Sequence, residues 1–162
     1  MASGDHRGPT PDTITGVGLR VGLIAARWNT EVVLRLLTGA KASLESLGVR
    51  DLREVEVPGC FEIPLACSAM AKSAQVDAIV CVGAVIRGET THYELVAGEC
   101  GTGVQRVQLD TGIPIGFGVL TVENLDQAMK RSQVPEGHNV GAEAAEAAIE
   151  MARLNQAWRR GS

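Results

Sequence analysis

The chain repeats one pattern four times: a short strand-like run rich in β-branched and other apolar residues is followed by a stretch with helical spacing. The strand-like runs are residues 19–26, 52–59, 77–86 and 113–122. Apolar strands that alternate with helices are typical of a parallel sheet covered on both faces. We therefore predict an α/β protein with three α/β/α layers and a parallel four-stranded core sheet.

Five segments have the spacing of helices that bury one face. They are residues 31–48, 63–74, 93–109, 124–131 and 140–158. Gly48 is expected just past the end of the first helix, and Pro64 in the first turn of the second. Within the third helix, Gly98, Gly101 and Gly103 indicate that a neighbouring element packs closely.

The length of 162 residues fits one domain. We expect this domain over residues 19–160, after a flexible arm over residues 1–18 that is rich in Gly, Pro, Thr and Asp. The arm has no apolar core of a signal peptide, and no apolar run reaches the roughly 18 residues that span a bilayer. The net charge of −4 argues against nucleic acid as a partner.

The cysteines are scattered and form no CxxC pair: Cys60, Cys67, Cys81 and Cys100. Without an export signal, this pattern predicts reduced thiols in the cytoplasm and not a zinc site.

Ligands of parallel α/β sheets bind beyond the carboxyl ends of the strands. The candidate site segments are therefore those that follow each strand: residues 27–29, 59–62, 87–92 and 123–124.

The turn after the third strand is the richest of these segments in polar residues. Thr91 and Glu94 match the T-x-x-E capping box, which predicts a helix start at Thr91. Free amides at that start, preceded by Gly88, indicate an anion site. At a helix N-terminus, His92 is expected to stay neutral near pH 7 and to carry a proton. The alternative is a plain capped helix with a surface histidine.

Three of the five aromatic residues, Trp28, Phe61 and Tyr93, follow strand ends, where they can stack on a flat heterocycle. A hydrophobic staple at a helix entry is the alternative for Trp28. Asn29 or Thr30 is the expected N-cap of the first helix.

Three further residues have two interpretations each. Glu62 is either a ligand contact to ring nitrogens or a favourable acid in a first helical turn. Cys60 could be a nucleophile, but no second histidine stands at an obvious partner position. Arg131 either complements a helix C-terminus or binds phosphate, if the fold brings it near a strand end.

The chain resembles the lumazine synthase family in six segments that cover about residues 19–155: AARWN, VPGCFEIP, DAIVCVGAVIRGETTHYELVA, IPIGFGVLTVEN, QAMKR and GAEAAEAAIEM. Of these, PGCFEIP and IRGETTHY are specific. The resemblance implies a flavodoxin-like subunit and a transferase of riboflavin biosynthesis. Such an enzyme condenses 5-amino-6-(D-ribitylamino)uracil with 3,4-dihydroxy-2-butanone 4-phosphate to 6,7-dimethyl-8-ribityllumazine. It releases phosphate and water, and it needs no cofactor or metal.

The resemblance also implies a role for each candidate residue. Trp28 is expected to stack on the uracil ring. The ring and its ribityl chain are held by residues of two segments: Cys60, Phe61, Glu62, Ala84, Val85 and Ile86. Phe117 closes the pocket from the neighbouring subunit. The amides of Glu89 and Thr90 hold the phosphate, Arg131 is its cation, and His92 transfers protons. Arg87 has no assigned role.

Three positions depart from the family pattern. Trp28 stands where Phe is common, and Cys60 stands where a small residue such as Ala is usual. Val140 stands where many members have Lys, so Arg131 is expected to carry more of the charge that faces the phosphate.

The resemblance implies at least a homo-pentamer with active sites shared between neighbouring subunits, and riboflavin synthase as a further partner. Residues 132–141, SQVPEGHNVG, are about one residue longer than the turn of cage-forming members. They also contain Pro135, which stiffens the turn. We therefore expect a pentamer or decamer, and not a cage of sixty subunits.

Two other functions are compatible with this fold class. A non-catalytic relative could bind flavin or form a shell, but the presence of His92 and Arg131 argues against it. A flavodoxin-like electron carrier would bind FMN tightly, and the purified protein would be yellow.

Overall fold

The computed structural model describes residues 7–161. Its elements follow one another as β1 (Arg20–Ala26), α1 (Thr30–Ser46), β2 (Asp51–Val57), the short 3-10 helix η1 (Cys60–Glu62), α2 (Ile63–Lys72), β3 (Ala78–Ile86), α3 (His92–Thr111), β4 (Ile115–Val122), α4 (Leu125–Lys130) and α5 (Val140–Arg159). The sheet is parallel throughout, with the strand order β2-β1-β3-β4.

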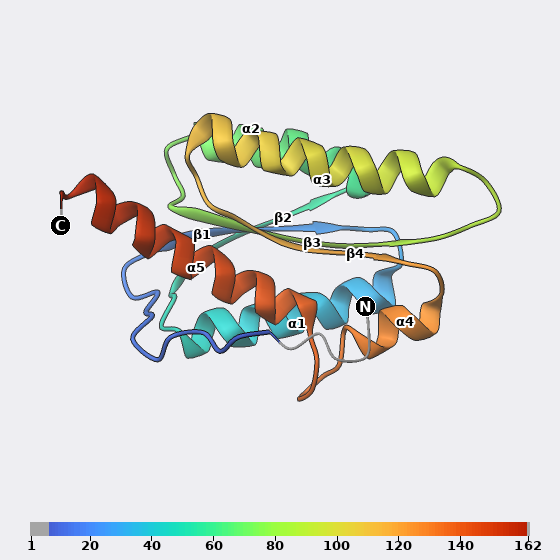
Figure 1. Cartoon of the computed structure of the whole chain (residues 1–162), viewed down its shortest axis with the longest axis horizontal. Helices are drawn as coiled ribbons and strands as arrows, with labels where there is room; N and C mark the ends of the chain where they lie inside the picture. Colours follow the sequence, from blue (N-terminus) through green and yellow to red (C-terminus); the bar gives the residue numbers. More distant parts are fainter. Residues whose placement is uncertain (1–6, 162) are drawn as a thin grey trace.

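The predicted three-layer, flavodoxin-like α/β fold is confirmed. Helices α1, α4 and α5 lie on one face of the sheet, and α2 and α3 lie on the other (Figure 1). The carboxyl ends of the strands point toward the right in this view. None of the described helices is both long enough and apolar enough to cross a bilayer.

Two hydrophobic cores hold the layers together, one on each face of the sheet. The first joins the sheet to α1 and α5 through residues such as Leu23, Leu36 and Ile149. The second joins it to α2 and α3 and contains all four cysteines. Strand β3 is buried almost throughout because it lies inside the sheet, whereas β2 forms an edge and exposes Glu54 to Glu56.

Local signals placed most of the helix ends correctly. Gly48 lies just past α1 with a φ of +89°, which favours glycine, and Pro64 lies in the first turn of α2.

A Cβ at Gly103 would lie 2.7 Å from Cγ of Pro64, so the predicted close packing of α3 is confirmed there. At Gly98 no atom of the same chain lies within 4 Å of the corresponding Cβ position, so no element of this subunit packs closely there.

The segment before β1 has no helix or strand over residues 7–18. Arg153 of α5 donates hydrogen bonds to the carbonyl oxygens of Thr15 at 2.6 Å and Val17 at 2.7 Å. The backbone N–H of Gly16 donates to the carbonyl of Leu47 at 2.7 Å. The first six residues of the predicted arm lie outside the described residues, and the flexibility of the arm stays a prediction.

Candidate active site

The segments that follow β1, β2 and β3 meet around one cavity of about 430 Å³. Its wall includes most of the residues for which the family resemblance implies contact with ribitylaminouracil, together with His92. The predicted residues in the wall are Trp28, Cys60, Phe61, Glu62, Ala84, Val85, Ile86 and His92. The two specific motifs, residues 58–64 and 86–93, therefore contribute to a single concave site.

Trp28 and Phe61 expose large aromatic surfaces at this cavity, 71% and 54% of their area. Aromatic rings this exposed add little to the core and remain free to stack on a planar ligand. A Cβ at Gly59 would lie 2.9 Å from Cδ1 of Trp28 and 3.2 Å from Oε2 of Glu62. Glycine at this position thus leaves the space that the indole and the carboxylate occupy.

Asn29 is the N-cap residue of α1, as predicted, but its side chain makes no capping hydrogen bond. Its backbone is left-handed, with a φ of 58°, a conformation that Asn adopts more readily than most residues. Its side-chain Nδ2 donates a hydrogen bond of 2.8 Å to the carbonyl of Ala84. The Thr30 hydroxyl donates to the carbonyl of Arg27 at 2.9 Å and caps no amide either. Asn29 therefore ties the turn that bears Trp28 to the cavity wall in β3.

Cys60 lies in the wall with 4% of its area exposed, and it packs against Gly83. Burial raises the pKa of the Cys60 thiol to about 11. A thiol with this pKa stays protonated at neutral pH, which disfavours Cys60 as a nucleophile.

The turn between β3 and α3 begins its helix where the sequence predicted, with Thr91 as the N-cap residue. The predicted capping box is wrong, however. Thr91 accepts no capping hydrogen bond, and the Glu94 carboxylate pairs with Arg87. The Thr90 hydroxyl accepts a hydrogen bond of 3.3 Å from the amide of His92.

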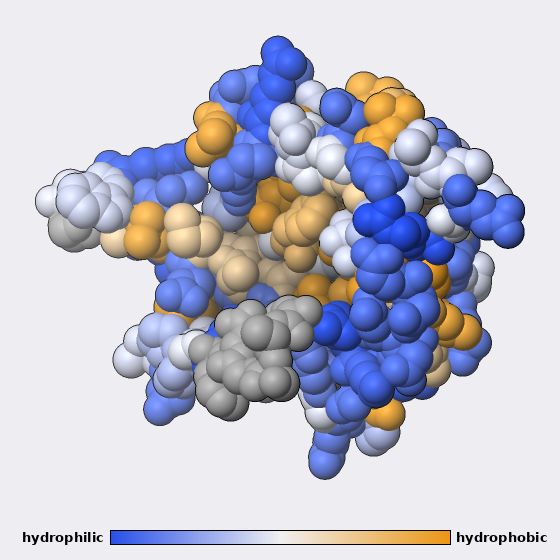
Figure 2. Space-filling model, turned by 45° about the vertical axis from the view of Figure 1, so that its right-hand side comes forward, coloured by the Kyte–Doolittle hydropathy of each residue, from blue (hydrophilic) through white to orange (hydrophobic). Residues whose placement is uncertain are grey.

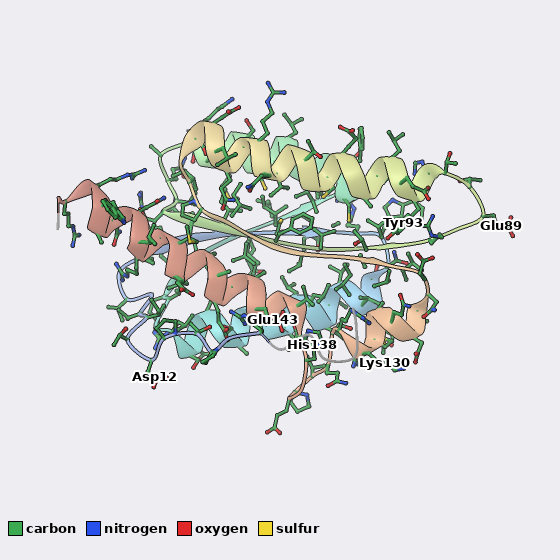
Figure 3. The ribbon with its side chains drawn as sticks, in the orientation of Figure 1. Asp12, Glu89, Tyr93, Lys130, His138 and Glu143 are labelled. Atoms are coloured by element: carbon green, nitrogen blue, oxygen red, sulfur yellow. The ribbon has the colours of Figure 1, made fainter. Side chains whose placement is uncertain are left out.

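The backbone amides of residues 88–91 make no hydrogen bond within the part of the chain that the structure describes. Four consecutive free donors that lead into a helix N-terminus are suited to bind an anion. Glu89 lies at the outer end of this loop, and Tyr93 lies back toward the sheet (Figure 3).

Four predicted site residues do not line this cavity: Glu89, Thr90, Phe117 and Arg131. Glu89 and Thr90 are exposed on the loop beside it. Phe117 is exposed on β4, which is an edge strand. Arg131 follows α4 and donates a hydrogen bond of 3.0 Å to the carbonyl of Gln127. Their roles toward a ligand, like those of the cavity residues, stay predictions.

Asn29 and Gly59 also line the cavity, within the predicted segments, and sequence reasoning missed only two of the lining residues: Leu95 and Val96. Leu95 and Val96 stand three and four residues after His92 in α3. Residues at this spacing share one helix face, so the helical period could have identified them once His92 was chosen. Among the described residues, no three His, Cys, Asp or Glu side chains are grouped as metal ligands would be.

Comparisons with known proteins agree with this arrangement. Residues 18–156 match the family described as 6,7-dimethyl-8-ribityllumazine synthase. A protein of that name from Azoarcus sp. is 46% identical over 156 residues, which cover 95% of this chain and 97% of the relative. Proteins of the same name from Cupriavidus necator and Cupriavidus pinatubonensis are each 47% identical over 152 residues. These cover 93% of this chain and 88% and 87% of the respective relatives. The chain belongs to the 6,7-dimethyl-8-ribityllumazine synthase family.

Proposed function

We propose that this protein condenses 5-amino-6-(D-ribitylamino)uracil with 3,4-dihydroxy-2-butanone 4-phosphate to 6,7-dimethyl-8-ribityllumazine, releasing phosphate and water. It thereby acts as a transferase in the penultimate step of riboflavin biosynthesis. The observation that carries the proposal is that both family-specific motifs, residues 58–64 and 86–93, meet at one cavity.

The cavity suits a planar heterocycle with a polar substituent. The exposed indole of Trp28 offers a face for stacking, while Val85 and Ile86 offer an apolar wall. The Glu62 carboxylate adds an acceptor for N–H groups of the ring. The uracil is therefore assigned to this cavity, with its ribityl chain along the same wall.

The loop over residues 88–91 suits the phosphate of the second substrate, because its four amides are free and the N-terminal end of α3 attracts negative charge. His92 stands where this loop meets the cavity. Joining an amine to a carbonyl requires protons to leave nitrogen and to reach oxygen. We assign these transfers to His92, between the uracil cavity and the phosphate loop.

We also propose a homo-pentamer or a decamer in which Phe117 and Arg131 of one subunit complete the cavity of another. Two features support this. Phe117 is exposed on an edge strand, and Arg131 lies outside the cavity of its own chain. In addition, α5 exposes Met151, Leu154 and Trp158. Figure 2 shows an apolar, hollowed area between hydrophilic rims on this side of the molecule. Exposed apolar surface of this kind is typical of an interaction site.

The loop between α4 and α5 bears on the size of the assembly. Ser132 and Asn139 pair as an isolated antiparallel bridge, and His138 lies 3.1 Å from the Glu143 carboxylate (Figure 3). The loop extends away from the sheet (Figure 1), which would keep pentamers from closing into a cage.

Light scattering tests the assembly. With 17.0 kDa per chain, a pentamer is expected near 85 kDa and a decamer near 170 kDa, at five and ten times the subunit mass. A dominant species near 1,020 kDa, about sixty times the subunit mass, would contradict the proposed size. Riboflavin synthase stays an expected partner.

Mixing the purified protein with both substrates tests the reaction, with the fluorescence of the lumazine as the readout. We expect product without added metal, and the same rate in the presence of a chelator. Absence of product would contradict the proposal, and so would activity that disappears with the chelator and returns with a metal. A yellow protein that binds FMN tightly and forms no lumazine would favour the electron-carrier alternative.

A further inference from the structure

Arg87 lies at the centre of a cluster beside the phosphate loop. Its Nε donates a hydrogen bond of 2.7 Å to Oε2 of Glu123, and its Nη1 donates to Oε1 of Glu94. Its guanidinium carbon lies 4.3 Å from the centre of the Tyr93 ring. The Arg87 guanidinium thus donates hydrogen bonds to two carboxylates and lies over an aromatic ring.

These partners come from both sides of the loop over residues 88–91. Arg87 stands directly before the loop, where its backbone N–H donates to the carbonyl of Val122 at 2.9 Å and extends the pairing of β3 with β4. Tyr93 and Glu94 stand in the first turn of α3, directly after the loop and His92. The Arg87 side chain therefore joins the two ends of the loop.

Glu123 connects this cluster to the turn between β4 and α4. The backbone N–H of Glu123 donates to Oε1 of Gln127 at 2.8 Å. Helix α4 therefore holds Glu123 in place. Arg87 consequently holds the loop against an element that is itself anchored.

Charge and exposure show what this cluster can contribute. Two carboxylates surround one guanidinium, so Arg87 has little positive charge to offer a phosphate directly. The hydrogen bond from Arg87 lowers the pKa of Glu94, which keeps this carboxylate ionised at neutral pH. The side chains of Arg87, Glu94 and Glu123 are 37%, 55% and 56% exposed. Ion pairs this exposed add little to global stability, so their main effect is on local geometry.

We propose that Arg87 is a positioning residue that holds the loop over residues 88–91 in shape, with its free amides and His92 directed toward the phosphate-bearing substrate. The role rests on the proposed function, since the loop matters only if a phosphate binds there.

Steady-state kinetics of Arg87→Ala test this role. We expect the KM for 3,4-dihydroxy-2-butanone 4-phosphate to rise about tenfold, because misplaced amides bind the phosphate less well. The KM for the ribitylaminouracil should change by less than about twofold, because the partners of Arg87, which are Tyr93, Glu94 and Glu123, do not line its cavity. A merely structural role would lower the active fraction, and thus kcat, without separating the two KM values.

Arg20→Ala is the matched control. Arg20 contacts Asp77 through Nε at 3.2 Å and Nη2 at 3.0 Å, and it is 39% exposed, close to Arg87. This pair stands at the amino end of β1, away from the cavity. We expect Arg20→Ala to leave both KM values unchanged.

Two milder variants keep the proposal testable if Arg87→Ala fails to fold. Glu123→Gln keeps Arg87 but weakens one of its contacts, and it should raise the same KM by less. Arg87→Lys should restore only part of the affinity, because a single ammonium cannot span both carboxylates and the ring. Melting temperatures of all variants report whether each one folds.

The possible results separate the two proposals. An active wild-type protein whose KM values are unchanged in Arg87→Ala, or raised equally for both substrates, would overturn the role of Arg87. A wild-type protein that forms no lumazine would contradict the proposed function. In that case titration calorimetry with inorganic phosphate still tests Arg87, because phosphate should bind the wild-type protein more tightly than the variant.

Discussion

Helices α3 and α5 have 20 residues each and cover opposite faces of the same sheet, yet they are buried to very different extents. Helix α5 buries six residues: Gly141, Ala144, Ala145, Ala148, Ile149 and Ala152. Helix α3 buries only Cys100 and Val104, and it exposes Leu95 and Leu109.

The difference reflects the two sequences. The small residues of α5 allow its backbone to approach the neighbouring elements closely, and a Cβ at Gly141 would lie 2.1 Å from the carbonyl oxygen of Leu36 in α1. In α3, Gly98 has open space around it. We infer that α5 mainly stabilises the subunit, whereas α3 mainly presents His92 and the phosphate loop. The predictions below test this division, from the largest expected effect to the smallest.

Truncation of the core should cost more on the α5 face. Ile149 is completely buried, so Ile149→Ala should lower the free energy of unfolding by about 2–5 kcal/mol. Val104→Ala in α3 should cost about two thirds as much, since it removes two buried carbon atoms and Ile149→Ala removes three. Urea unfolding at one fixed protein concentration measures both values. Equal losses would mean that α3 supports the subunit as much as α5 does.

Activity should fall more when the proposed phosphate-binding cation, Arg131, is removed than when the proposed proton carrier, His92, is removed. Arg131 precedes α5, and His92 begins α3. Arg131→Ala should lower kcat/KM by about 10²- to 10³-fold, because it removes a charged donor to a dianion and Val140 offers no replacement. His92→Ala should cost less, because water or phosphate can carry protons in its place. A larger loss for His92→Ala at saturating substrate would reverse this ranking and make α3 the more important element for catalysis.

Replacing a glycine by alanine should change stability in opposite directions in the two helices. Gly141→Ala should lower stability by about 1–3 kcal/mol, because the new methyl group would meet the backbone of α1. Gly98→Ala should raise stability by about 0.5–1 kcal/mol, because alanine favours the helix and meets no neighbour. Thermal melts compare the two variants with the wild-type protein. A lower stability of Gly98→Ala would indicate that a second subunit covers this part of α3.

The smallest expected effect is on acid stability. The hydrogen bond from Arg87 lowers the pKa of Glu94 below 4.5, its ordinary value. The unfolded chain therefore takes up this proton at a higher pH than the folded chain. The stabilisation is present above about pH 4.5 and is lost as the pH falls through the folded pKa.

Glu94→Gln should remove this contribution and make the melting temperature depend less on pH below about pH 4.5. Asp77→Asn is the corresponding variant for the α5 side of the comparison. The pKa of Asp77 is lowered by its hydrogen bond with Arg20 and, in part, by Arg153 of α5. An acid response of Glu94→Gln identical to that of the wild-type protein would show that the Arg87 contact is weak in solution.

Sequence reasoning found the cavity but misread several of the contacts around it. The T-x-x-E pattern predicted that Glu94 would cap its own helix, yet Arg87 is a stronger partner for a carboxylate than a backbone amide is. Asn29 is the N-cap residue of α1, as predicted, but its side chain caps no amide and bonds to Ala84 on a strand 55 residues further along. In both cases the polar side chain bonds to a partner outside its own helix instead of to the nearest backbone amide.

The sequence by itself determined the succession of strands and helices along the chain, the parallel sheet and the edge of the sheet at which the site lies. These follow from the periodicity of apolar residues, because every element must bury one face or both, whatever its neighbours are. The tertiary structure alone decided which polar groups pair and how closely elements approach, as at Arg87, Asn29 and Gly141. Such contacts depend on ångström-scale distances between segments far apart in the chain, and a linear pattern of residues does not contain those distances.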